Sequence, residues 1–150
     1  MERQDRSRML RDRLILVIDD DEDIRLFLLS LFADAGARLC EAADGTAGLE
    51  LARKLRPDLI LLDLVLPDRD ETEVFCELRE SVETANIPVC ILTGHPEFRK
   101  YIYDRPVREP EGFVNKPFDP DELVNTVRRI IGLRDRKIDR KRQLEGGPAI

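Results

Sequence analysis

The chain has 150 residues, 42% of them hydrophobic and 37% charged, and its formal net charge is -6. This length and apolar share predict one domain with one core. The acidic balance argues against wholesale binding to nucleic acid or to an anionic membrane, and no apolar run is long enough to cross a bilayer. The first 13 residues carry five arginines but lack the apolar region of a secretory signal. We therefore expect a cytoplasmic protein with neither a nucleic acid nor a membrane as its direct partner.

The first part of the chain alternates predicted strands with predicted helices. Residues 14–18 form an unbroken aliphatic run, which is typical of a strand buried on both faces of a parallel sheet. A helix follows and ends near Gly36, and after it come a strand at 38–42 and a helix at 46–55 that Pro57 ends. The positions predicted to face the sheet are Ile24, Phe27, Leu28 and Leu31 in the first helix, and Gly48, Leu51, Ala52 and Leu55 in the second.

The second part of the chain continues this alternation. Its predicted elements are a strand at 59–62, a helix marked by Val74, Phe75, Leu78 and Val82, a strand at 88–92, a helix at 97–103, a strand at 112–115 and a last helix. Three prolines between Thr93 and Gly112 predict a short fourth helix with an irregular loop behind it. The last helix opens at Asp119, a capping residue that Pro120 follows at the first helical position.

Five strands that alternate with helices predict an α/β fold, a doubly wound five-stranded parallel sheet with helices on both faces. The folded domain is expected at 14–133, after a flexible basic extension at 1–13. Residues 134–150 form a basic tail that is either a frayed end or a continuation of the last helix. The three cysteines lie in or beside apolar stretches without zinc-ligand spacing, so we interpret them as buried thiols.

Polar residues follow the predicted strands at the points where these strands end. Asp19 and Asp20 follow the first strand, Asp63 the third, Thr93 the fourth and Lys116 the fifth. Because binding sites of such sheets lie at the carboxyl ends of the strands, we expect these side chains to converge. Three gathered carboxylates repel one another unless a hard cation lies among them, and an all-oxygen ligand set favours Mg²⁺ or Mn²⁺ over zinc. The lysine and the threonine hydroxyl would bind phosphoryl oxygens beside a carboxylate nucleophile.

Four sequence blocks carry a resemblance to a known family. They are VIDDDEDIR at 17–25, LLDLVLP at 61–67, ILTG at 91–94 and FVNKPF at 113–118. In this order and at this spacing they resemble the signature blocks of the response regulator receiver domains (CheY-like) of two-component signalling. The resemblance covers roughly 14–133 and implies a flavodoxin-like sheet with the strand order 2-1-3-4-5.

The resemblance also implies a role for each matching residue. Asp63 would be the phosphoacceptor, and Asp19, Asp20 and the main-chain carbonyl of Val65 would complete a magnesium site with it. Lys116, which would precede a cis bond to Pro117, would pair with the phosphoryl oxygens. Thr93 would be the switch hydroxyl, and Phe113 the aromatic side chain that follows the movement of Thr93. Val65 and His95 would flank the phosphoryl group and tune its lifetime.

The implied function is that of a phosphorelay switch. A sensor histidine kinase or phosphotransfer protein would donate the phosphoryl group, and a downstream protein target or output domain would respond. The chain would be a regulatory phosphoacceptor rather than an enzyme, although its own residues would catalyse its phosphorylation and dephosphorylation.

Two other functions stay open at this point. Glu71 stands where the family usually has glycine, and the fourth helix is interrupted by proline, so the chain is alternatively an interaction module that works without phosphorylation. A small phosphatase of the haloacid-dehalogenase type would instead use Asp19 and Asp21 as its acidic pair and leave Asp63 idle. For Asp19 and Asp20 simple capping of the following helix is a further interpretation.

Overall fold

A computed structural model describes residues 7–64 and 71–146. The strands are β1 (Leu14–Ile18), β2 (Arg38–Ala42), β3 (Leu59–Asp63), β4 (Val89–Thr93) and β5 (Gly112–Asn115). The helices are α1 (Glu22–Asp34), α2 (Gly45–Leu55), α3 (Glu71–Glu80), α4 (Arg99–Tyr103) and α5 (Pro120–Gly146), with a 3-10 turn at Pro96–Phe98 before α4. All described helices and strands therefore alternate along the chain, as the sequence predicts.

The five strands form one sheet in the order β2-β1-β3-β4-β5, and every neighbouring pair is parallel. This confirms the predicted fold class and strand order. The chain leaves β1 first toward β2 and later returns to its other side as β3, so the direction of winding reverses between β1 and β3. Ligand sites of open α/β sheets lie at such a reversal, outside the carboxyl ends of the strands.

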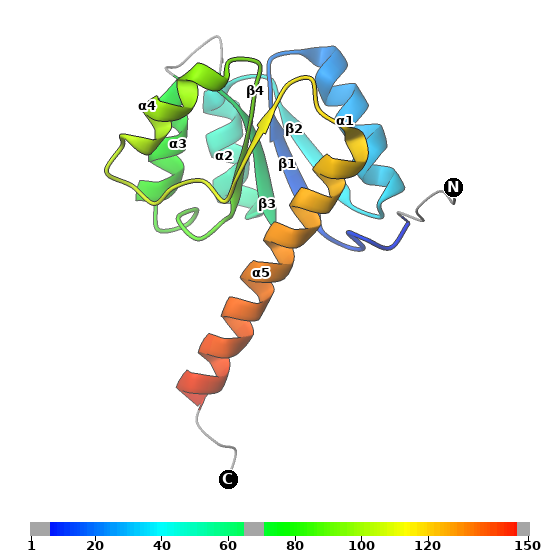
Figure 1. Ribbon diagram of the computed structural model, residues 1–150. Coiled ribbons are helices and arrows are strands. Elements are labelled where there is room, and N and C mark those ends of the chain that lie inside the picture. Colours follow the sequence, from blue (N-terminus) through cyan, green and yellow to red (C-terminus); the bar gives the residue numbers. More distant parts are fainter. Residues whose placement is uncertain (1–6, 65–70, 147–150) are drawn as a thin grey trace.

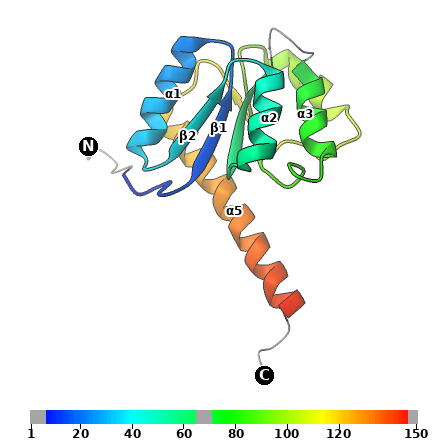
Figure 2. The same ribbon diagram turned by 180° about the vertical axis from the view of Figure 1, so that it is seen from behind.

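The strands β1, β3 and β4 are almost entirely buried because helices cover both faces of the sheet. Ile15 and Val17 pack with α1 and α5 on one face, while Leu16 and Ile18 pack with α2 and α3 on the other. The two views of the molecule show these layers (Figure 1, Figure 2). Successive side chains of a strand point to opposite faces, so an unbroken aliphatic run contributes to both cores at once.

Three apolar side chains predicted to face the sheet do not do so. Val82 is 95% exposed because α3 ends at Glu80, before this residue. Phe27 and Leu55 are 47% and 40% exposed. Phe32 and Leu49 are buried instead, on α1 and α2. These helices carry more apolar residues than one face holds, and the sheet decides which of them are covered.

The loop between α4 and β5 is held by a buried arginine of α3. The side chain of Arg79 is 2% exposed and pairs with Glu111 at 2.7 Å. It also donates hydrogen bonds to the carbonyls of Ile87, Arg108 and Glu109. Carbonyls outside helices and strands need such donors, so one side chain holds the backbone that leads into β4 and into β5.

The last helix begins as predicted and extends beyond the sheet. Asp119 accepts hydrogen bonds from the backbone N–H groups of Asp121 and Glu122. The first half of α5 packs on the sheet through Leu123, Val127 and other apolar residues, whereas its second half projects past the end at which β1 starts (Figure 1). No helix in 7–64 or 71–146 is both long and apolar enough to span a bilayer.

Candidate functional site

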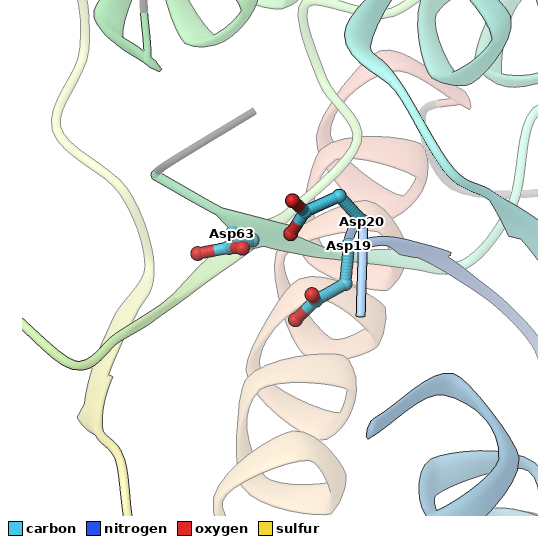
Figure 3. Close-up of side chains that lie close together, drawn as sticks. All are labelled: Asp19, Asp20 and Asp63. Carbon is cyan, nitrogen blue, oxygen red and sulfur yellow. The ribbon is translucent and has the colours of Figure 1, made fainter. Parts of the chain in front are cut away.

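Three aspartates from two neighbouring strand ends meet at the carboxyl edge of the sheet. Asp63 is the last residue of β3, and Asp19 and Asp20 directly follow β1. One carboxylate oxygen from each lies within 4.8 Å of the other two, and the three side chains face a common space (Figure 3). Asp19 and Asp63 are 1% and 6% exposed, while Asp20 is exposed. The sequence therefore predicted this cluster and its place correctly.

Lys116 supplies the positive charge that faces these acids. Its Nζ lies 2.9 Å from Asp19 Oδ2 and 3.6 Å from Asp63 Oδ1. Burial opposes the charge of Lys116, but the hydrogen bond to Asp19 and the charges of Asp63 and Asp19 outweigh it, so the pKa of Lys116 is raised above its ordinary value. The lysine is therefore fully charged at neutral pH. Its bond to Pro117 is cis, as the resemblance implies.

Asp19 and Asp20 do not cap the following helix. The N-cap of α1 is Asp21, whose side chain accepts hydrogen bonds from the N–H groups of Asp23 and Ile24. The capping interpretation of Asp19 and Asp20 is thus wrong, and the two side chains are left for the cluster. Asp21 would be the second acid of the phosphatase alternative, but its side chain is engaged in capping the N-terminus of α1.

Arg25 holds the backbone of Asp19 in place, a role that the sequence did not predict. Its guanidinium donates to the main-chain carbonyl of Asp19 at 2.8 Å and lies 3.5 Å from Glu41 of β2. It thereby ties the end of β1 to β2 and to its own helix α1. Arg25 stands inside the first signature block, but its spacing alone gives no sign of this backbone contact.

Thr93 ends β4 beside the cluster, with its hydroxyl engaged by the next loop. The side chain is fully buried. Its Oγ1 accepts a hydrogen bond from the His95 N–H at 2.9 Å and donates to the His95 carbonyl at 3.3 Å. The imidazole of His95 is exposed and pairs with Glu97 at 3.2 Å. To donate a hydrogen bond to a group on Asp63, the Thr93 hydroxyl would have to give up its hydrogen bond to the His95 carbonyl.

Phe113 in β5 is half-buried beneath α4. Its ring stacks on Tyr103 with 6.4 Å between ring centres, and the Arg99 guanidinium lies 5.0 Å from its centre. Arg99 also lies over the Tyr103 ring. A cation over an aromatic face is attracted by the ring, so this short helix is attached to β5 through the very side chain that the resemblance marks as a switch.

The remaining predicted position, Val65, lies outside the described residues. Glu71 is the first residue of α3. Among the described residues, Asp12 and Arg56 are the non-glycine ones with positive φ. A left-handed backbone, the conformation that favours glycine, is therefore not required at Glu71.

The donor set fits a hard divalent cation. It consists of three carboxylates, two of them buried. The half-buried Lys116 lies within 4 Å of two of these acids, Asp19 and Asp63. Carboxylate oxygens are preferred by Mg²⁺, which commonly binds through one or two carboxylates together with a phosphate. The molecule is thus a doubly wound α/β protein whose acidic pocket lies at the winding reversal, the place where ligands of this fold class bind.

Comparison with known proteins assigns the family. The profile of the response regulator receiver domain matches residues 15–128, and the chain therefore belongs to this family of two-component signalling.

Its relatives include both short and long proteins. The chain is 38% identical over 124 residues to the DNA-binding dual master transcriptional regulator RpaA of Synechocystis sp., covering 81% of this chain and 50% of RpaA. It is 33% identical over 120 residues to the sporulation initiation phosphotransferase F of Bacillus subtilis, covering 80% and 94% of the two chains. The chain thus spans about half the length of the first relative and nearly all of the second.

Solved structures agree on the fold. The CheY-like response regulator receiver domain protein of Methanospirillum hungatei superposes with a TM-score of 0.77 at 20% identity, over 84% of this chain and 98% of the other. At this identity the likeness concerns the fold.

Proposed function

We propose that the chain is a phosphoacceptor switch that receives a phosphoryl group on Asp63 in a Mg²⁺-dependent reaction. The observation that carries this proposal is the placement of the Asp63 carboxylate, 3.6 Å from Lys116 Nζ and within 4.8 Å of the Asp19 and Asp20 carboxylates. A carboxylate in such a site is a competent nucleophile toward phosphorus. The proposal also accounts for the neighbours of Asp63: Asp19 and Asp20 would bind the metal ion, and Lys116 would pair with the phosphoryl group.

The proposed transfer runs from a phosphohistidine of the donor protein. An Asp63 carboxylate oxygen forms a bond to phosphorus while the phosphorus–nitrogen bond breaks, and the electron pair returns to the imidazole. Lys116 is placed to pair with the phosphoryl oxygens, since its ammonium already faces both Asp19 and Asp63. Positioning and charge stabilisation account for most of the catalysis of phosphoryl transfer, and these residues supply both.

Asp19, Asp20 and Asp63 would hold the Mg²⁺, and the carbonyl of Val65 is a further proposed ligand. When bound, the ion would offset the repulsion between three carboxylates and an incoming phosphoryl group. The Asp19 carboxylate is oriented for this task by hydrogen bonds from the N–H of Asp21 and from Lys116, while Arg25 holds the main-chain carbonyl of Asp19.

The switch that we propose connects Asp63 to α4. A phosphoryl group on Asp63 adds strong acceptor oxygens, which compete with the His95 backbone for the Thr93 hydroxyl. Release of His95 frees the loop that leads into α4. Phe113, which contacts Arg99 and Tyr103 of α4, would follow this movement. Phosphorylation thereby biases an equilibrium between two arrangements of this surface. Val65 and His95 are proposed to tune how long the phosphoryl group persists.

Receiver domains act with histidine kinases and phosphotransferases, and we propose such a protein as the donor. The responding partner is proposed to be a downstream protein or an output domain, as the longer relatives suggest by their length. The chain then acts as a regulatory phosphoacceptor, with the domain at 14–133.

Incubation with acetyl phosphate and Mg²⁺, followed by intact-mass measurement, tests the proposal. The parent is expected to gain one phosphoryl group, and Asp63→Asn, or the parent with Mg²⁺ chelated, to gain none. Glu50→Gln, an exposed acid of α2, is the matched control and should react like the parent.

Other results would point to the alternatives. A parent that gains no mass under these conditions would support an interaction module that works without phosphorylation. Hydrolysis of a generic phosphomonoester that Asp19→Asn abolishes and Asp63→Asn leaves intact would support a phosphatase.

A further inference from the structure

A second charged region lies at the opposite end of the sheet from the acidic cluster. It is a hollow of about 540 Å³ between the segment 7–13, which precedes β1, and the middle of α5. Among its lining residues are Met9, Arg13, Arg128, Arg129, Gly132 and Arg136. The hollow belongs to the end at which β1 starts, whereas Asp19 and Asp63 lie where β1 and β3 end. It is therefore separate from the proposed phosphorylation site.

Two acids near this hollow are already paired with arginines. Asp135 is paired with Arg13, and Asp58 is contacted by Arg13 and Arg134, each at 3.7 Å. The Leu14 N–H also donates to Asp58 at 2.8 Å. These two carboxylates consequently present little free negative charge to a ligand.

Three lining arginines keep their charges available. Arg128, Arg129 and Arg136 are exposed, and within 7–64 and 71–146 none of them has an ion-pair partner. The lining as a whole holds four arginines against one aspartate. In a chain of net charge -6, this is a concentrated positive field at one place.

The free arginines lie on one side of α5 with an opening between them. Arg128, Gly132 and Arg136 follow one another at four-residue spacing and so share a helix face. A Cβ atom at Gly132 would have no heavy atom within 4 Å, so packing does not require glycine there, and glycine is a poor helix former. The missing side chain leaves bare helix surface between the guanidinium groups of the preceding and following turns.

We propose that this hollow binds a small anion that carries several phosphate groups in a row. Arginine pairs with phosphate through two parallel hydrogen bonds. Arg128 and Arg136 are about two turns apart, which is about 12 Å along the helix axis. A single phosphate group is too small to contact both guanidinium groups, whereas a row of linked phosphate groups is long enough. An inorganic polyphosphate and a nucleoside triphosphate share this chemistry. The volume lies within the range of small-ligand pockets.

Titration calorimetry with the full chain tests the proposal. Tripolyphosphate is titrated at about 0.15 M salt, in the presence of EDTA so that no metal bridges it to the acidic cluster. We expect a one-to-one complex whose dissociation constant rises at least about tenfold in the double variant Arg128→Gln/Arg129→Gln. The matched control is Arg53→Gln/Lys54→Gln, which removes two exposed charges from α2 and should bind like the parent.

Variants of Gly132 separate a ligand site from general charge attraction. Gly132→Ala should still bind, because open space surrounds the added carbon, while Gly132→Glu should lose binding although circular dichroism shows an intact fold. Parallel titration of ATP distinguishes the two sources: equal affinity assigns the site to the phosphate chain, and tighter ATP binding assigns it to a nucleotide.

Three outcomes would overturn the proposal. They are an absence of tripolyphosphate binding by the parent, an equal loss in the α2 control, and preferential binding of a short DNA duplex, which would make this face a nucleic-acid surface. None of them bears on phosphorylation of Asp63, which the acetyl phosphate experiment tests separately.

Discussion

Replacing the proposed phosphoacceptor by its neutral isostere should make the metal-free protein more stable. In Asp63→Asn, one carboxylate is removed from a cluster in which each acid lies within 4.8 Å of the two others. The same change removes the attraction between Asp63 and Lys116 at 3.6 Å. Lys116 keeps its closer partner, Asp19, at 2.9 Å. Among the charged groups described in 7–64 and 71–146, the sign of the effect therefore depends on whether the two repulsions from Asp19 and Asp20 exceed the one attraction to Lys116.

The distances decide this balance in favour of the variant. By Coulomb's law, two repulsions at 4.8 Å exceed one attraction at 3.6 Å by about 0.6 kcal/mol in a water-like dielectric and by about 2 kcal/mol at an effective constant near 20. Asp20 is exposed, so screening favours the lower part of this range, and we expect about 1 kcal/mol. For a chain of this size that corresponds to a rise in Tm of about 2–4 °C.

Thermal unfolding of both proteins in EDTA measures the difference, and a second series with Mg²⁺ adds the linked effect. Mg²⁺ should raise the Tm of the parent more than that of Asp63→Asn, because a ligand that binds the folded state stabilises it by mass action. Glu50→Gln should shift the free energy of unfolding by less than about 0.5 kcal/mol. If Asp63→Asn were no more stable than the parent in EDTA, the inferred repulsion within the cluster would be wrong.

Three further experiments test other parts of the structure. Arg79→Met should lower the free energy of unfolding by about 3–5 kcal/mol in urea, because Glu111 and three carbonyls lose a buried partner; a loss below that of the exposed Arg108→Gln would contradict this. Burial raises the pKa of Cys90 from 9.0 to about 12, so native protein at pH 8 should resist alkylation there, and the stability this thiol contributes should be present below pH 9 and lost as the pH rises toward 12. Detection of Cys90 alkylation in folded protein would refute the burial argument. Val65→Asn should speed autodephosphorylation severalfold by orienting water, and an unchanged rate would remove Val65 as a tuning residue.

The predictions on the site succeeded where local sequence and topology act together. An aliphatic run such as 14–18 has to be covered on both faces, which requires a parallel sheet with helices on each side. In such a sheet the acids that follow β1 and β3 lie at one edge, so the meeting of Asp19, Asp20 and Asp63 follows from the order of the elements. The role of each residue is implied only by the resemblance of the signature blocks and stays a prediction, because neither spacing nor hydrophobic pattern supplies it.

Other features were decided by contacts between distant parts of the chain. Lys116 lies nearer to Asp19, a residue 97 positions away, than to Asp63. The contact of Arg25 with the backbone of Asp19 depends on how α1 lies on the sheet. The third helix was predicted to include Val82, but residues 81–86 form turns instead, and Val82 is exposed.

The sequence by itself therefore determined the elements, the order of the strands through the family resemblance, and the edge at which the acids gather. It could do so because hydrophobic period and strand ends are local properties. Tertiary structure alone decided which acid the lysine binds, which hydroxyl is held by His95, and which arginines of α5 stay unpaired beside Gly132. Each of these depends on side-chain packing between segments far apart in the chain, and a local pattern carries no information about it.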